Sequence, residues 1–419
     1  FAGVDMHKYL ATYYAKYGGV MSFRLATKDW IVLNDIEAIT QALLKQGESF
    51  SGRPQSYLMN QLTEGCVYRM GKRSMVGIIN EENQNFLSVI QSSGGKVNIL
   101  SEFRKLLSNI VTNLIMGKRF NYEDEKLIFL RQMRRENKMK RCPIFPYPTI
   151  YHTHLSTQTF KQGYQRLIAS TQRVLDIISE ITEEHKNSFD ENNLRDFIDI
   201  FLLEMKRRNS EYFTELQLLH LVRDLFVGAI DTTTATLGWG IICLLHYPEC
   251  QVRIQEEIDD VIGCAEPDMS HHESMPYLRA FIQEVHRFQT IAPLNIPHCV
   301  TEDCVLFGYH IPKSTPVMSN IWRVHNDPKY WENPEKFSPE RHLDSEGRFV
   351  PSNRVLSFAV GHRSCLGVQL ARVELFLFYA STLKKYEFQI DPEYGLPDWS
   401  NDRSGTVKTP KKFSVLLKS

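Results

Sequence analysis

The spacing of apolar residues predicts a chain that is mainly helical. Over three long stretches, apolar side chains recur at intervals of three and four residues, which places them on one face of an α-helix. These stretches are 102–116, 162–185 and 369–386. Near the N-terminus, 21–25 and 30–33 are rich in strand-forming residues, and a helical pattern follows over 36–45. The pattern therefore predicts a mainly α fold that carries small β-sheets.

The longest predicted helix crosses the middle of the sequence. Thr214 is a favourable N-terminal cap, Gln217 stands three residues further on, and Pro248 ends the pattern. About 32 residues at roughly 1.5 Å each give a helix of roughly 48 Å, long enough to cross a whole domain. Gly228 lies near its middle, where glycine costs about 1 kcal/mol relative to alanine. This glycine indicates either close approach by a bulky group or an ordinary packing contact.

Composition excludes several functional classes. The 49 basic and 49 acidic residues cancel, so no overall charge attracts nucleic acid. The eight cysteines are too sparse for a disulfide-stapled domain and include no C-x-x-C pair, which indicates reduced thiols and disfavours structural zinc. No run of eighteen apolar residues occurs, so the chain as given is expected to be soluble, with any membrane anchor upstream of Phe1. Without repeats or linkers, residues 1–419 are predicted to form a single domain.

One ten-residue segment carries the sharpest chemical signal. Residues 358–367 read Phe-Ala-Val-Gly-His-Arg-Ser-Cys-Leu-Gly and lead directly into a predicted helix. The segment resembles the haem-binding loop of the cytochromes P-450, and all five residues that the family fixes there are present: Phe358, Gly361, Arg363, Cys365 and Gly367. A thiolate at the start of a helix is stabilised by the helix dipole and by backbone N–H groups. Taken alone, the segment has a second interpretation, a buried free cysteine in a glycine-rich turn.

The resemblance gives each residue of this loop an expected role. It implies that Cys365 is the axial ligand of a haem iron, where a thiolate directs electron density toward O–O cleavage. Arg363 is expected to bind a haem propionate through a charge-assisted hydrogen bond, and Phe358 is expected to pack against the porphyrin face. Gly361 and Gly367 are expected to let the backbone close tightly around the sulfur.

A triad of charged residues forms a second match. Glu284 and Arg287 lie three residues apart on one predicted helix, a spacing that alone means little because such pairs are common on surfaces. The resemblance adds Arg341, from the sequence Pro-Glu-Arg, and implies that the three form a buried triad supporting the haem pocket.

A third match lies near the middle of the longest helix. Polar groups such as Asp231 and Thr232 are costly there unless they serve a purpose. By resemblance, Thr232 holds bound dioxygen and its protons, and Asp231 relays protons from solvent. The alternative is a threonine-rich turn whose hydroxyls bond back to their own helix. Elsewhere, His298 aligns with a propionate-binding position, and a solvent-facing histidine is the equal alternative.

One family element has no match in the sequence. After the Arg-Pro element that ends at Pro54, the related enzymes carry a helix with the pattern Trp-x-x-x-Arg, which grips a haem propionate. Here sixteen residues separate Pro54 from Gly71, and no tryptophan occurs between Trp30 and Trp239. Three nearby basic residues do not align with the missing arginine: Arg69, Lys72 and Arg73. A natural shortening, an engineered deletion and omitted segments are all open explanations.

The resemblance extends from about Lys16 to the end and is closest to the animal microsomal enzymes that hydroxylate drugs, steroids and fatty acids. It implies a monooxygenase that binds haem b and inserts one oxygen atom of O2 into a lipophilic small molecule. Electrons would come from NADPH through a partner reductase. The protein is expected to act as a monomer at the cytosolic face of the endoplasmic reticulum membrane.

Two other functions stay open at this point. The first is a haem-thiolate isomerase or dehydratase that needs no reductase, and the Asp231–Thr232 pair argues against it. The second is a non-catalytic haem-binding protein, which the missing Trp-x-x-x-Arg helix motivates. The apolar stretch 291–294, the loop 405–407 and the segment after Pro54 are expected to line a substrate pocket.

Overall fold

The computed structural model describes six stretches of the chain: 5–25, 28–54, 75–132, 158–208, 213–402 and 407–419. The segment that follows Pro54, with Arg69, Lys72 and Arg73, lies outside these residues. So do residues 405 and 406 of the expected substrate loop.

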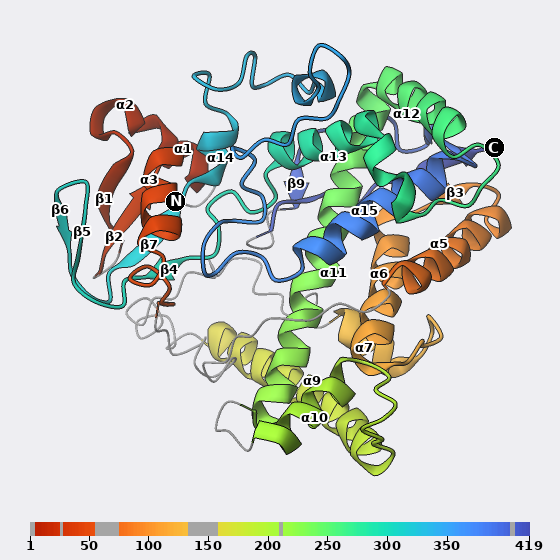
Figure 1. The fold of residues 1–419 in the computed structure, drawn as a ribbon, viewed down its shortest axis with the longest axis horizontal. Helices are drawn as coiled ribbons and strands as arrows, with labels where there is room; N and C mark the ends of the chain where they lie inside the picture. The colour runs from red at the N-terminus through yellow and green to blue at the C-terminus, as the bar shows by residue number, and fades with distance from the viewer. Residues whose placement is uncertain (1–4, 26–27, 55–74, 133–157, 209–212, 403–406) are drawn as a thin grey trace.

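Helices dominate the described residues, which confirms the mainly α prediction (Figure 1). In chain order they are α1 (Met6–Thr12), α2 (Tyr14–Tyr17), α3 (Ile36–Thr40), the π-helical turn η1 (Gln41–Lys45), α5 (Met75–Ser92), α6 (Ile99–Met116), α7 (Glu125–Gln132), α9 (Gln158–Asn187), α10 (Phe197–Arg208), α11 (Glu215–His246), α12 (Pro248–Val261), the 3-10 turn η2 (Met269–Ser274), α13 (Pro276–Gln289), α14 (Ile321–His325), the 3-10 turn η3 (Pro339–His342) and α15 (Val368–Leu383). The three predicted amphipathic stretches are α6, α9 and α15.

The strands form small sheets, the largest of which gathers at one side of the molecule (Figure 1). They are β1 (Val20–Leu25), β2 (Lys28–Leu33), β3 (Lys96–Val97), β4 (His298–Cys299), β5 (Cys304–Leu306), β6 (Tyr309–Ile311), β7 (Pro316–Ser319), β8 (Glu387–Ile390), β9 (Asn401–Asp402), β10 (Thr409–Pro410) and β11 (Val415–Lys418). The order in the largest sheet is β1-β2-β7-β4, in which β2 and β7 are parallel and the other pairs antiparallel. Gly52 bridges to Cys299 of β4, so the segment before Pro54 lies beside His298.

Helix α11 is the longest element and runs through the middle of the molecule (Figure 1). As predicted, Thr214 caps it: its hydroxyl oxygen accepts a hydrogen bond from the backbone N–H of Gln217 at 3.3 Å. The helix packs against α6, α9, α12, α13 and α15. Among the described helices it alone is long and apolar enough to cross a membrane, yet 67% of its most apolar window is buried in the protein. It is therefore a core helix here.

Two hydrophobic clusters share α11. Its N-terminal half, from Leu218 to Ile230, packs with residues of α6, α9 and α10. Its C-terminal half, from Leu237 to Leu245, packs with α5, α6, α12, α13 and α15. The residues between these halves, 231–236, belong to neither cluster and are mostly polar. Thr233 to Thr236 are nevertheless buried, so only Asp231 and Thr232 of this stretch are partly exposed.

Candidate functional site

Just before this polar stretch, α11 has an exposed position formed by Val227 and Gly228, here called the opening. Val227 is 39% exposed and Gly228 is also exposed, although the helix is buried on either side. A side chain added at Gly228 would meet no protein atom within 4 Å. The glycine therefore makes no close contact with described protein atoms beyond its own helix. Of the two explanations for Gly228, the packing contact is the one that the geometry does not support.

Thr232 lies one turn further along the helix, where its hydroxyl donates to the carbonyl oxygen of Gly228 at 2.6 Å. This is the back-bonded geometry expected of a threonine-rich turn, and Thr236 repeats it toward the carbonyl of Thr232 at 3.0 Å. The two differ in their surroundings because Thr236 is buried, whereas Thr232 is partly exposed beside the opening. The hydroxyl oxygen of Thr232 keeps its lone pairs for a donor from a ligand.

Asp231 is held by an arginine of a neighbouring helix. The Nε atom of Arg104, on α6, lies 3.5 Å from a carboxylate oxygen of Asp231, and both side chains are largely but not fully buried. The next residue but one, Thr233, donates to Glu374 of α15 at 3.1 Å. Burial raises the pKa of Glu374 to about 8, against the lowering effect of the Thr233 bond, so this carboxyl is largely neutral near pH 7.

The loop that carries Cys365 is shaped by its own backbone. The backbone N–H of Cys365 donates to the carbonyl of Phe358 at 2.8 Å, which closes the loop before α15 begins. Gly361 has a φ of 80°, and a Cβ there would overlap the carbonyl oxygen of Leu43 in η1. Gly361 therefore meets the expectation of close backbone packing. Gly367 does not: its φ is −88° and no described atom crowds its Cβ position.

Cys365 is exposed, in contrast to Cys243, Cys250 and Cys299, which are buried. The surrounding protein still desolvates its thiol and raises the pKa, while a hydrogen bond from the backbone of Gly367 lowers it. An exposed thiol that receives a backbone N–H at the start of a helix suits metal ligation, because a bound cation removes the thiol proton outright. The donor chemistry at this position thus fits the iron of a haem.

Phe358 lies at the edge of the same site. Its ring contacts His286 of α13 in a T-shaped arrangement, with centroids 4.9 Å apart. The guanidinium of Arg372, on α15, lies 5.9 Å from its centroid. Phe358 therefore joins the cysteine loop to α13 and α15.

Arg363 and His298, the two expected propionate-binding residues, come together beside residues 50–53. Arg363 donates from Nε to the carbonyl of Ser51 at 2.7 Å, and His298 donates from Nδ1 to the carbonyl of Phe50 at 2.8 Å. The other ring nitrogen of His298 is buried without a partner in the described structure. Burial, together with the positive charges of Arg53 and Arg363, lowers the pKa of His298 to about 4. A carboxylate would satisfy this nitrogen and reverse that effect, so the residues present fit a haem propionate.

The predicted triad comes together in full. Glu284 is completely buried and accepts two hydrogen bonds from Arg287, at 2.7 and 2.8 Å, and one from Arg341 at 3.0 Å. The prediction missed two further partners: His342, 2.9 Å away, and the backbone N–H of Ser338 at 3.1 Å. Although burial opposes the charge, these partners hold the pKa of Glu284 below its usual value.

Three functional neighbours were missed because each depends on a contact distant in sequence. Arg53 lies in the Arg-Pro element, which was noticed only as a family match. Arg104 pairs with Asp231, and Glu374 bonds to Thr233 across two helices. For Glu374 a signal was available, because it is a lone carboxylate in the apolar repeat of a predicted core helix.

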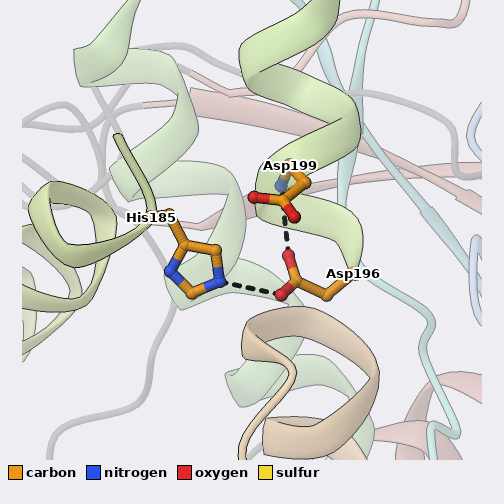
Figure 2. Close-up of side chains that lie close together, drawn as sticks. All are labelled: His185, Asp196 and Asp199. Carbon is orange, nitrogen blue, oxygen red and sulfur yellow. Dashed lines mark hydrogen bonds and ion pairs between the residues drawn. The ribbon is translucent and has the colours of Figure 1, made fainter. Parts of the chain in front are cut away.

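A separate cluster has the composition of a metal site but not its free ligand atoms. Figure 2 shows His185, Asp196 and Asp199, whose possible ligand atoms lie within 4.8 Å of one another. Both ring nitrogens of His185 are engaged, with the carbonyl of Ile181 and with Asp196, each at 2.7 Å. Asp196 also accepts from the backbone N–H of Asp199, and Arg195 binds both oxygens of Asp199. The cluster is therefore a structural network around the start of α10.

The chain is similar to known proteins along nearly its whole length. The family model described as Cytochrome P450 matches two overlapping stretches, residues 2–68 and 58–417. Cytochrome P450 2U1 of Mus musculus is 32% identical over 455 residues, covering 99% of this chain and 83% of the relative. Cytochrome P450 2F2 of Mus musculus is 33% identical over 435 residues, with 96% and 87% covered. Cytochrome P450 2C4 of Oryctolagus cuniculus is 33% identical over 440 residues, with 98% and 89% covered.

Proposed function

Because this chain belongs to the cytochrome P450 family of haem-dependent monooxygenases, we propose that it oxidises a lipophilic steroid, fatty acid or xenobiotic. In this reaction one atom of O2 enters a C–H or C=C bond, and the other leaves as water. The two electrons and two protons come from NADPH and solvent, and a partner flavoprotein reductase delivers the electrons. The observation that carries the proposal is the pairing of two features on helices in contact: the thiol that precedes α15 and the opening in α11.

Several residues of this chain would hold the cofactor, each at a different part of it. Haem b supplies the activation of dioxygen once it is bound. Cys365 would bind the iron through its sulfur, and Arg363 with His298 would hold the propionates. Gly361 keeps the loop close to η1, and the Glu284 triad supports the fold beneath the site.

Thr232 and Asp231, beside the opening in α11, would transfer protons. The hydroxyl of Thr232 donates to Gly228 in the present geometry, so it can accept a hydrogen bond and pass on a proton after a rotation about χ1. Asp231 would bring protons from solvent, and Arg104, 3.5 Å away, would orient its carboxylate. Apolar groups near the opening, such as Val227, favour a lipophilic substrate.

The cellular setting is part of the proposal. We propose that the protein works as a monomer at the cytosolic face of the endoplasmic reticulum membrane and meets its reductase there. An isomerase or dehydratase is the alternative function. It would need neither reductase nor the Asp231–Thr232 pair, and this pair lies beside the opening in α11.

Turnover with labelled dioxygen tests the proposed function. The purified holoenzyme is given NADPH, reductase, isotopically labelled O2 and a panel of steroids, fatty acids and drug-like probes. We expect a product that carries one labelled atom and forms only with reductase. Products that form without reductase, or without label, would support the isomerase or dehydratase.

A threonine comparison sharpens this test. Thr232→Ala should uncouple NADPH consumption from product by about tenfold, which corresponds to the loss of one hydrogen bond of about 1.4 kcal/mol. Thr236→Ala is the matched control, because Thr236 makes the same backbone bond but is buried in the helix contact. Equal coupling in the two variants would contradict the role of Thr232.

A further inference from the structure

Lys408 is a partly buried lysine for which the proposed function has no use so far. It follows directly on the expected substrate loop 405–407. Its backbone N–H donates to the carbonyl of Ile291 at 2.8 Å, and its carbonyl accepts from the indole N–H of Trp239 in α11 at 2.7 Å. Ile291 begins the apolar stretch 291–294, which is the other expected lining of the pocket. Lys408 therefore lies where two predicted parts of the substrate pocket meet.

The ammonium group of Lys408 bonds only to uncharged oxygens. Its Nζ lies at the C-terminal end of α13, where it donates to the backbone carbonyl and the side-chain oxygen of Gln289, at 3.3 and 3.2 Å. The ring centroid of Trp239 is 5.5 Å away. Among the described residues no carboxylate forms an ion pair or a hydrogen bond with this lysine. An ammonium has three N–H donors, so one of them is left for a ligand.

The surroundings of this ammonium disfavour its charge. Burial lowers the pKa of Lys408 to about 8, and the positive charge of Lys8 contributes to the lowering. Asp5 and Cys243 act in the opposite direction but do not compensate. A cation that has lost hydration and has no counterion is costly, so an anion that reaches Nζ is bound favourably.

His7 of α1 offers a second donor nearby. The residue is only 7% exposed, and its Nε2 is buried without a partner in the described structure. Burial lowers its pKa to about 4 against the opposing effect of Asp5, and the charge of Lys408 contributes to the lowering. The ring is therefore neutral at pH 7 and close enough to Lys408 to feel its charge. A neutral imidazole can carry its proton on Nε2 and donate it to an anion.

Lys408 adjoins the same face of α11 as the opening. Eleven residues separate Gly228 from Trp239, which is about three helical turns, so the two lie on one side of the helix. Thr232 lies between them, seven residues or about 10 Å before Trp239. The opening and Lys408 are therefore within the span of one alkyl chain.

We propose that Lys408 and His7 bind the carboxylate of the substrate, which makes the substrate a lipophilic carboxylic acid. The proposal rests on the proposed function, since the ligand is the molecule that is oxidised. With its carboxylate at Lys408 and its chain directed along α11, the acid reaches the opening with the carbons remote from the carboxylate. Oxidation is therefore expected on that part of the chain.

Matched pairs of an acid and its methyl ester test the proposal. The holoenzyme is titrated with dodecanoic acid, hexadecanoic acid and their methyl esters in a calorimeter. We expect the wild type to prefer each acid. Lys408→Met keeps the apolar stem and should weaken acid binding about tenfold, as for one hydrogen bond to a charged group, with ester binding nearly unchanged. Equal weakening of acid and ester would overturn the proposal, because Lys408 would then only cap α13. So would a wild type that binds the esters as tightly as the acids.

Two further variants separate the site from general charge. Lys412→Met is the matched control, since Lys412 is an exposed lysine four residues further on, and the preference for acids should not change. An equal loss in this variant would attribute the preference to surface charge and contradict the proposal. His7→Phe keeps a ring beside Trp322 but removes Nε2, so it should weaken acid binding alone. Unchanged acid binding would contradict the part of His7.

The pH dependence of the wild type needs no variant. With a pKa of about 8, Lys408 loses most of its charge between pH 7 and pH 9, so acid binding should weaken about tenfold over this range. Ester binding should stay constant. A lysine with an ordinary pKa remains charged at pH 9, so constant acid binding would contradict the role of Lys408.

Turnover separates this proposal from the proposed function. Labelled product from steroids or esters, with no preference for acids, would refute the carboxylate site alone. Acid binding that depends on Lys408, with no labelled product from any compound, would refute the proposed function and the claim that the bound acid is a substrate.

Discussion

Two groups of basic residues in the described part of the chain differ in whether the chain supplies their counterion. Around Glu284, the side chains of Arg287, Arg341 and His342 all reach the same carboxylate. The second group, here called the cationic cradle, consists of Arg53, Arg363 and His298. The half-buried Arg53 and Arg363 donate only to backbone carbonyls among the described residues, and one buried ring nitrogen of His298 has no partner there.

This difference distinguishes basic residues that stabilise the fold from basic residues that bind a ligand. A buried charge needs an opposite charge or a strong donor set, because desolvation is expensive. Where the chain provides the carboxylate, the group is complete and serves the fold. Where it does not, the missing carboxylate has to come with a ligand, and haem b carries two. The comparison is therefore the physical basis for assigning the cradle to the cofactor.

The largest expected effect is at the completed cluster. Glu284→Gln keeps the shape of the side chain but leaves Arg287 and Arg341 buried without their counterion. We expect the free energy of unfolding to fall by about 3–5 kcal/mol, as when one partner of a buried ion pair is removed. Urea denaturation of the holoenzyme measures the change.

Glu340→Gln is the control for this prediction. Glu340 also pairs with an arginine, Arg253, but both side chains are about half exposed, so its loss should cost under about 1 kcal/mol. Similar decreases in the free energy of unfolding for Glu284→Gln and Glu340→Gln would mean that the buried cluster stabilises the fold no more than a surface ion pair.

A smaller effect is expected in the cradle, and on a different quantity. Arg363→Gln removes a donor that the fold uses only for the carbonyl of Ser51, so the stability of the protein without haem should change little. Haem b should be held more weakly by about 1.5–3 kcal/mol, the range for hydrogen bonds to charged groups. Haem transfer kinetics measure how firmly haem b is held. Urea denaturation of the haem-free protein measures its stability. A loss of stability without a loss of haem retention would mean that Arg363 stabilises the fold and does not bind haem.

Glu374 extends the comparison to an acidic residue, because it is a buried carboxyl with no cation bonded to it among the described residues. Its pKa is raised from about 4.5 to about 8, so the folded protein binds a proton that the unfolded chain releases in this range. Stability is therefore fully present below about pH 4.5 and is lost as the pH rises toward 8, by at most about 1.4 kcal/mol per pH unit. Glu374→Gln should remove this slope in urea denaturation series. An unchanged slope would show that Glu374 is charged in the folded protein.

The smallest effect is expected at His185. Burial would lower its pKa, but its bonds to Asp196 and to the carbonyl of Ile181 outweigh this and raise it above 6.5. A raised histidine pKa contributes stability that is present at acid pH and is lost as the pH rises past the folded value. His185→Gln should therefore lose more stability at pH 6 than at pH 9. The reverse order would mean that His185 is neutral, and its cluster would become available to a metal.

Features that depend on residues close together in the sequence, such as helix ends, were predicted best. Thr214 and Pro248 bound α11 because capping and the missing proline N–H act within a few residues. The helix predicted over 369–386 ends earlier, at Leu383, because Glu387 already belongs to β8, which pairs with β11. The pattern over 36–45 turns into a π-helix at Gln41, which apolar spacing does not distinguish from an α-helix.

Contacts distant in sequence were beyond prediction from spacing. The cradle joins Arg53 to a loop more than 240 residues away, and the bond between Thr233 and Glu374 spans 141 positions. The family resemblance supplied Arg363 and His298 as binding residues, and it gave Arg53 only as part of the Arg-Pro element. Only the fold shows that β4 brings all three together.

The central claim is that Cys365 ligates a haem iron. Reduced holoenzyme treated with carbon monoxide should give the red-shifted difference band of a thiolate-ligated haem, and Cys365→Ala should lose it. Cys264→Ala, at the other exposed cysteine of the described chain, should keep the band. A wild-type protein without this band, or a Cys365→Ala variant that retains it, would contradict the account.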